Sequence, residues 1–340
     1  MGTLRADAPM RDRFRGCLVG QALGDALGFV VEGQSPSFCR RYAEERLGGG
    51  KVLGTGRRPY PFGQYSDDTQ LARELMQSYA TKGRFDPEDY AGRIAAIFSE
   101  GRIVGRGRAT EEAAERLARG VAWDEAGTPP PSAGNGSAMR AGPVGLFFHD
   151  DPDGLAAAAR EQGMITHRDT RCSAGAIAVA GAVALAIREG PVDRLDFLGR
   201  LSELTVRVEA PFAEALMSLS GWVGLPPEEA VVRILGVGAE GEEDEGWAGI
   251  SPFVVPSVLW SLYSFLKSPE DYRQTIRTAI AVGGDVDTTA AMAGAVSGAH
   301  LGLSALPRNL AGRLTDQGSW GLPELTNLAD ECYEVKHPRT

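Results

Sequence analysis

The stretch YSDDTQLARELMQSY, residues 65–79, places Ser66, Asp67 and Asp68 directly before a run of helical periodicity. Apolar residues recur there every three to four positions, which predicts an amphipathic helix. Two adjoining carboxylates repel each other, so something must stabilise them. Ser is a preferred N-cap, and acids in a first helical turn gain about 0.3–1 kcal/mol from the helix dipole. A bound cation is the alternative, and this stretch alone favours the cap.

A second stretch, GGDVDTTAAMAGAVSGAHLG at 283–302, repeats the arrangement. A glycine turn delivers Asp285, Asp287 and the hydroxyl of Thr288 to the start of a helix whose small residues allow another backbone to approach. We expect the two helix starts to face each other. Four carboxylates without an adjoining basic cluster need compensation, and two Mg²⁺ or Mn²⁺ ions about 3.5–4 Å apart would supply it. The hydroxyls of Ser66 and Thr288 could complete the coordination.

The remaining sequence predicts an all-α fold in one domain, residues 1–340, because helical periodicity dominates and alternating strand patterns and fixed repeats are almost lacking. In SPEDYRQTIRTAIAVGG, Ser268 is the expected cap, Pro269 the first helical residue and Gly283 the stop. The glycines at 48–50, the prolines at 129–131 and the acidic run at 241–246 are expected to be loops. Further helices are expected at 14–29, 87–100, 109–120, 153–162, 172–188, 194–206, 210–219, 227–235, 256–267 and 288–302.

Composition excludes several classes of protein. The formal net charge of -10 argues against a nucleic-acid-binding surface. The four cysteines are scattered without a CxxC pair, which favours reduced thiols and a cytoplasmic location. The four histidines are not at ligand spacing, so an HExxH-type zinc site is excluded and hard, oxygen-bound metals are favoured.

Targeting and membrane segments are not expected. The first sixteen residues lack an apolar stretch after their charges, so no secretory signal is expected. The most apolar segment, 174–187, is shorter than the roughly 20 residues that span a bilayer. It is better interpreted as a buried helix.

Three further segments could contribute to a site. Glu32 follows an apolar run and is either simply solvated or part of a site. In GNGSAMRAGPVGLFF, 134–148, Gly134 and Gly136 around Asn135 indicate a tight turn with free backbone N–H groups, and Ser137 could cap the helix that follows. That turn could hold phosphate or be a plain loop-to-helix turn; it is neither a Walker loop nor a dinucleotide fingerprint. His167 is either a structural hydrogen-bonding residue or a contact to a ribose or base.

The order of the segments GDALG…VE, YSDDTQLA, GNGSAMR, THRDTRCSAGA and GGDVDTTAAMAGA resembles the ADP-ribosylglycohydrolase family. That family includes the dinitrogenase-reductase-activating glycohydrolases and the animal ADP-ribosyl-acceptor hydrolases. The resemblance covers residues 12–305 and leaves 306–340 as a C-terminal helical extension. It implies a compact orthogonal helical bundle, with two Mg²⁺ (or Mn²⁺) ions in a cleft.

Carried over by motif, the resemblance implies that Glu32 is the catalytic carboxylate and that the GNGSAMR loop holds a diphosphate. The implied metal ligands are Ser66, Asp67, Asp68, Asp285, Asp287 and Thr288. The implied substrate-binding residues are Ser132, Gly134, Asn135, Gly136, Ser137, Met139, His167 and Ile250. The chain departs from the family at three positions: Ser66 and Val286 stand where threonine is usual, and Ala133 stands where the serine-specific branch has a tyrosine.

The implied activity is hydrolysis of the C1″ glycosidic bond of ADP-ribose on a protein side chain such as serine or arginine, or on O-acetyl-ADP-ribose. ADP-ribose is the product, nucleic acid is a partner only as an ADP-ribosylated end, and the protein is expected to be a monomer. Two ions would orient the ribose hydroxyls and acidify a water, with Glu32 transferring a proton. The loops within 101–132 and 236–256 would meet the acceptor. Two alternatives remain: a non-catalytic ADP-ribose-binding or structural protein, and a two-metal phosphohydrolase.

Overall fold

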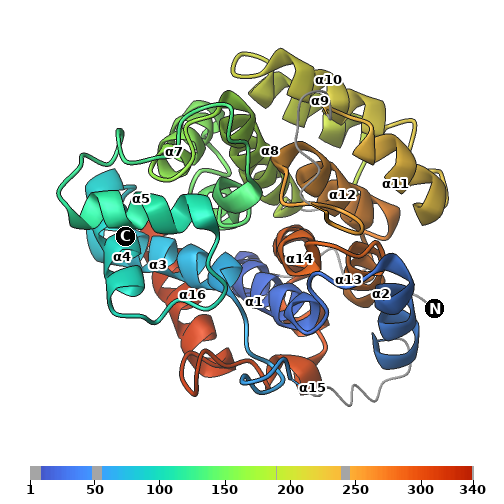
Figure 1. Cartoon of the computed structure of the whole chain (residues 1–340), viewed down its shortest axis with the longest axis horizontal. Helices are drawn as coiled ribbons and strands as arrows, with labels where there is room; N and C mark the ends of the chain where they lie inside the picture. The colour runs from blue at the N-terminus through green and yellow to red at the C-terminus, as the bar shows by residue number, and fades with distance from the viewer. Residues whose placement is uncertain (1–8, 48–55, 189, 239–245, 339–340) are drawn as a thin grey trace.

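The segments expected to be helical form helices in the described part of the chain, and the all-α fold class is confirmed. The computed structural model describes residues 9–47, 56–188, 190–238 and 246–338, and within these ranges only isolated β-bridges occur, without strands (Figure 1). Its α-helices are α1 Met10–Phe29, α2 Pro36–Tyr42, α3 Asp67–Lys82, α4 Pro87–Ser99, α5 Arg108–Ala118, α6 Gly142–Phe147, α7 Pro152–Met164, α8 Thr170–Ala186, α9 Arg194–Thr205, α10 Ala210–Leu219, α11 Pro227–Leu235, α12 Val254–Lys267, α13 Tyr272–Ala281, α14 Val286–Leu301, α15 Arg308–Ala311 and α16 Leu322–Lys336.

Two helix starts lie more than two residues from their predictions. Helix α13 begins at Tyr272 rather than at Pro269, because the side chain of Asp271, not of Ser268, caps it by accepting a hydrogen bond from the backbone N–H of Gln274. Helix α1 begins at Met10, earlier than residue 14. The prolines at 129–131 do form a loop. The glycines at 48–50, residues 1–8 of the N-terminal stretch and residues 241–245 of the acidic run lie outside the described residues.

Helices α1 and α14 run antiparallel at the centre of the molecule, with their backbones in close contact (Figure 1). A Cβ atom at Gly24 would lie 2.1 Å from the carbonyl oxygen of Ala290. In the opposite direction, a Cβ at Gly294 would lie 2.3 Å from the carbonyl oxygen of Gly20. The prediction that segment 283–302 lets another backbone approach is therefore confirmed. This contact brings Asp25 of α1 beside the first turn of α14.

Helix α3 is held between α1 and the C-terminal segment. The buried guanidinium of Arg73 donates to Asp316 at 2.7 Å and to the hydroxyl of Tyr65 at 3.2 Å. It also packs over the ring of Trp320, 4.8 Å from the centroid. Because breaking a buried ion pair costs about 3–5 kcal/mol, this network fixes the start of α3 relative to the body.

The apolar segments form one core rather than membrane spans. Helix α8 is buried along almost its whole length, as expected for segment 174–187. Among the residues described, none of the helices is both long and apolar enough to traverse a lipid bilayer. All four cysteines are buried free thiols.

Candidate active site

The first turns of α3 and α14 meet. Ser66 is the N-cap of α3, and its hydroxyl donates to Oδ2 of Asp68 at 2.9 Å. The hydroxyl of Thr288, in the first turn of α14, reaches the same oxygen at 3.3 Å. Ser66 therefore caps α3 and also contacts the carboxylate of Asp68 where the two acidic segments meet.

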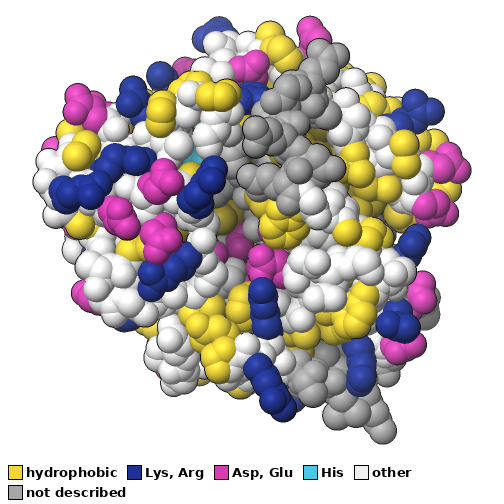
Figure 2. All heavy atoms as spheres, viewed as in Figure 1, with side chains coloured by type: hydrophobic (Ala, Val, Ile, Leu, Met, Phe, Trp, Pro, Cys, Tyr) yellow, Lys and Arg dark blue, Asp and Glu magenta, His cyan; other side chains and the backbone are white. Residues whose placement is uncertain are grey.

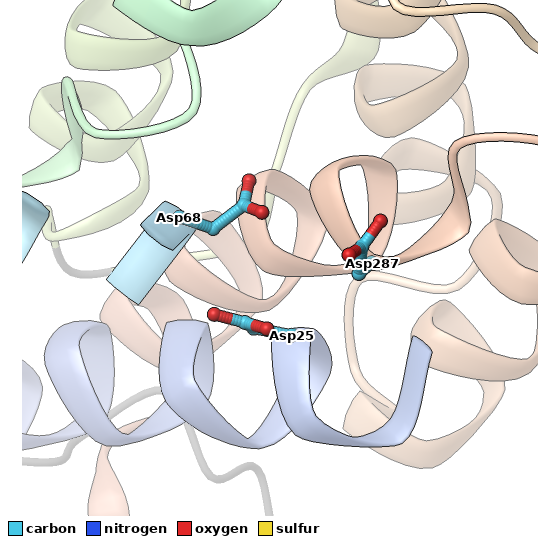
Figure 3. Close-up of side chains that lie close together, drawn as sticks. All are labelled: Asp25, Asp68 and Asp287. Atoms are coloured by element: carbon cyan, nitrogen blue, oxygen red, sulfur yellow. The ribbon is translucent and has the colours of Figure 1, made fainter. Parts of the chain in front are cut away.

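Two groups of three carboxylates lie where these helices meet. One contains Asp25, Asp68 and Asp287, and the other contains Glu32, Asp285 and Asp287. In each group one oxygen atom per residue lies within 4.8 Å of the others, and Asp287 belongs to both. Figure 3 shows Asp25, Asp68 and Asp287 converging from α1, α3 and α14. Figure 2 shows acidic side chains in a hollow near the centre of the view, where Figure 1 places the ends of α1 and α14.

Asp25 was not among the site residues expected from the sequence. Its carboxylate is fully buried and accepts hydrogen bonds from the backbone N–H of Ser66 at 2.9 Å and from the N–H and hydroxyl of Thr69 at 3.1 and 2.6 Å. It therefore ties α1 to the first turn of α3. A carboxylate inside the apolar run ALGDALG was the available signal, because a buried acid needs partners.

Asp67 lies at the edge of this cluster. It is buried, and a Cβ at Gly105 would lie 2.8 Å from its Oδ1. Within the described residues it belongs to neither carboxylate group. The loop that contains Gly105 therefore covers Asp67, and this loop falls within the segment 101–132 expected to meet the acceptor.

The crowded carboxylates are buried and repel one another. Burial raises the pKa of Asp67, Asp68 and Asp287 well above the usual value, and neighbouring carboxylates raise it further. Burial also raises the pKa of Asp25 to about 7 and of Asp285 to about 6. Over the described residues, these five aspartates form no salt bridge with Lys or Arg.

A hard divalent cation fits this donor set. Oδ1 of Asp68 is buried without a hydrogen-bond partner, which leaves an anionic oxygen uncompensated. The surrounding donors are carboxylate and hydroxyl oxygens, the ligands that Mg²⁺ and Mn²⁺ prefer. A cation site would explain this uncompensated buried oxygen, whereas a helix cap does not.

Glu32 is placed at the open side of the cluster. It follows α1, its side chain is 25% exposed, and it forms an ion pair with Arg57. The turn that contains it is held against α14, because the N–H of Gly33 donates to the carbonyl oxygen of Gly284 at 2.8 Å. Glu32 is thus a fixed carboxylate that solvent can reach.

The GNGSAMR loop contacts the carboxylates directly. The side-chain amide of Asn135 donates to Oδ2 of Asp285 at 2.6 Å. The backbone N–H of Asn135 donates to Pro252, so this amide is not free, and neither Gly134 nor Gly136 has a positive φ. Ser137 does not cap the following helix; its hydroxyl donates to the carbonyl oxygen of Cys172 at 3.0 Å. Residues Asn135–Ser137 form the expected tight turn, a single 3-10 turn, and side chains and neighbouring segments brace it.

The other expected substrate residues surround this loop. A Cβ at Gly134 or Gly136 would lie 3.3 or 3.1 Å from Nε2 of His167, so these glycines make room for the imidazole. Ile250 is fully buried, and its carbonyl oxygen accepts from the N–H of Asp285 at 2.8 Å. Two more lie along the loop: Ser132, whose carbonyl oxygen accepts from Cys172, and the buried Met139.

Known proteins support the family resemblance that the motifs indicate. The family model described as ADP-ribosylglycohydrolase matches residues 6–340. ADP-ribosylhydrolase ARH3 of Gallus gallus is 32% identical over 368 residues, covering 96% of this chain and 94% of that protein. An uncharacterized protein of Archaeoglobus fulgidus is 32% identical over 332 residues, covering 96% and 97%. ADP-ribosylarginine hydrolase Tri1 of Serratia proteamaculans is 25% identical over 335 residues, covering 95% and 79%.

A solved structure gives the same result for the fold. A chain of an ADP-ribosylglycohydrolase-related protein complex superposes with a TM-score of 0.68 at 28% identity, covering 96% of this chain and 99% of that one. The resemblance inferred from five separate motifs is confirmed by a family match that spans almost every residue. On its sequence and its fold, this chain belongs to the ADP-ribosylglycohydrolase family.

Proposed function

We propose that this protein hydrolyses the C1″ glycosidic bond between ADP-ribose and a modified acceptor, with the help of two divalent cations. One observation carries the proposal: two carboxylate groups that share Asp287 lie directly beside a glycine-rich loop. Membership of the ADP-ribosylglycohydrolase family supports a hydrolase acting on ADP-ribose conjugates.

Mg²⁺ is the expected cation, with Mn²⁺ as a substitute. The residues that would hold the two ions are Ser66, Asp67, Asp68, Asp285, Asp287 and Thr288, with Asp25 and Glu32 close by. When bound, such ions would supply positive charge that orients the ribose hydroxyls and acidifies a water.

The catalytic carboxylate of the proposal is Glu32. Cleavage at C1″ passes through an oxocarbenium-like state, which needs a deprotonated water and a proton for the leaving group. Glu32 is close to Asp285 and Asp287 yet partly exposed, so both water and acceptor can reach it. Its carboxylate also forms an ion pair with Arg57.

The ADP-ribose would lie along the GNGSAMR loop. Asn135 connects this loop to Asp285, so a ligand on the loop has its ribose next to the carboxylates. The substrate-contacting surface would come from Ser132, Gly134, Asn135, Gly136, Ser137, Met139, His167 and Ile250, the last through its backbone because its side chain is buried.

The names of the relatives do not identify the acceptor from which this protein would release ADP-ribose. The name of the Serratia relative specifies arginine, whereas that of the ARH3 relatives specifies no side chain. Release of ADP-ribose should therefore be measured on peptides modified at serine and at arginine and on O-acetyl-ADP-ribose, each with Mg²⁺ and with EDTA. We expect Mg²⁺-dependent release from at least one of these substrates.

A pair of variants separates catalysis from binding. Glu32→Gln should retain ADP-ribose binding and lose at least about a hundredfold in turnover, the usual contribution of a positioned acid or base. Glu203→Gln, a matched change at an exposed position of α9, should behave like the wild type. Normal turnover by Glu32→Gln would refute its catalytic role.

The same assay distinguishes the two alternatives. A two-metal phosphohydrolase would release AMP or phosphate from ADP-ribose or nucleotides. A non-catalytic protein would bind ADP-ribose without releasing it from any conjugate. Either outcome would replace the glycohydrolase proposal.

A further inference from the structure

The last residue of the GNGSAMR loop is a buried arginine, Arg140, without a carboxylate partner among the described residues. Arg140 is fully buried; its Nε donates to the side chain of Gln162 at 2.9 Å, and its Nη2 to the Gln162 carbonyl and to Oγ1 of Thr166, both at 2.8 Å. Its Nη1 has no hydrogen-bond partner. Burying a charge in this way is costly, so a role for it is expected.

The hydrogen bonds of Thr166 determine which nitrogen of His167 carries hydrogen. Oγ1 of Thr166 lies 2.8 Å from Nδ1 of His167 and accepts from Arg140. Thr166 is fully buried, and its hydroxyl has no other partner within the described residues. If Nδ1 also donated to it, the hydroxyl hydrogen would be buried without an acceptor. The hydroxyl must therefore donate to Nδ1, and the imidazole hydrogen resides on Nε2.

The Nε2 edge of the ring faces the loop. It lies next to Gly134 and Gly136, where a side chain would collide with the imidazole, and it has no partner among the described residues. Burial and the nearby Arg140 lower the pKa of His167 to about 3, so the ring is neutral. A neutral ring offers one N–H donor and carries no charge.

We propose that Thr166, oriented by Arg140, is a positioning residue that presents His167 to ADP-ribose as a fixed Nε2–H donor. The donor would bind an oxygen acceptor of the ligand lying on the loop. The identity of the ligand rests on the proposed function, whereas the position of the hydrogen is a property of the free protein. The position of the hydrogen and the identity of the ligand can therefore be refuted by separate experiments.

The position of the hydrogen can be measured by NMR on the full chain. The protein has four histidines, so selective ¹⁵N labelling gives four imidazole spin systems, and His167→Gln identifies that of His167. We expect hydrogen on Nε2 and a hydrogen-bonded Nδ1 in the wild type and in Thr166→Ser. In Thr166→Val the Nδ1 resonance should move to the position of a nitrogen without a donor. Hydrogen on Nδ1 in the wild type, or no change in Thr166→Val, would overturn the proposal.

Calorimetric titration with ADP-ribose tests the consequence. Thr166→Val should raise the Kd roughly two- to tenfold, the effect of one weakened hydrogen bond, and Thr166→Ser should restore the wild-type Kd. Thr205→Val is the control, because Thr205 is equally buried but donates within its own helix. Equal affinity of Thr166→Val and the wild type would overturn the positioning role. Absence of ADP-ribose binding to the wild type would instead contradict the proposed function.

Discussion

Thr288 donates its hydroxyl hydrogen to Oδ2 of Asp68 at 3.3 Å, across 220 residues of sequence. This bond joins the first turns of α3 and α14. A cap explains Ser66, but it does not explain why Oδ1 of the same Asp68 is buried without a partner. The proposed cation site accounts for both oxygens.

Asp25 is expected to be a structural link as well as a neighbour of the cation site. Thr69→Val removes the hydroxyl that donates to Asp25 without changing the charge of the carboxylate cluster, so the free energy of unfolding should fall by about 1–3 kcal/mol even with EDTA present. Urea denaturation measures this. Asp196→Asn, at an exposed surface pair of α9, is the control and should change stability by less than about 0.5 kcal/mol. A Thr69→Val protein as stable as the control would show that the hydrogen bonds of Asp25 do not hold α3.

The backbone contact between α1 and α14 predicts opposite effects for the same substitution at two helical glycines. Gly24→Ala would place Cβ 2.1 Å from a backbone oxygen, so the helices must separate and stability should fall by about 1–3 kcal/mol. Gly92→Ala, in α4, has no heavy atom within 4 Å of the new Cβ and should stabilise by about 0.5–1 kcal/mol. Thermal unfolding of both variants tests the contact. Equal shifts of Tm in the same direction would exclude it.

His167 predicts a pH dependence of stability. Its pKa is lowered to about 3 in the folded protein, against about 6.5 in the unfolded chain. The unfolded state therefore binds the extra proton between these values, and the stabilisation is complete above about pH 6.5 and lost as the pH falls towards 3.

The matching variant is His167→Gln, which cannot titrate. Between about pH 6.5 and 4.5 its free energy of unfolding should fall less steeply than that of the wild type, by up to about 1.4 kcal/mol per pH unit. Urea denaturation in EDTA at several pH values gives both slopes. Parallel slopes would mean that His167 is protonated in the folded protein.

The structure agrees with the predictions where local rules determine it. Helical periodicity located α3 and α14, the preference of serine for N-caps placed Ser66, and the small residues of α14 anticipated close backbone packing. The same pattern of acids at two helix starts led to the expectation that they converge.

Contacts whose hydrogen-bond partners come from distant segments could not be predicted from local rules. Ser137 is a good capping residue by type, yet its hydroxyl bonds to Cys172 on α8. Asp271 rather than Ser268 caps α13, a choice between two suitable residues three positions apart. Local rules identify Asp25 only as one acid in an apolar helix, because its hydrogen-bond partner Thr69 lies 44 residues away.

Direct measurement of cation binding tests the central claim most sharply. Equilibrium dialysis with Mn²⁺, followed by electron paramagnetic resonance of the free ion, gives the number of ions bound per chain. The account predicts two ions for the wild type and for Asp196→Asn, and at most one for Asp287→Asn, since Asp287 belongs to both carboxylate groups. If the wild type bound no Mn²⁺, or if Asp287→Asn bound as much as the wild type, the proposed metal centre would be wrong.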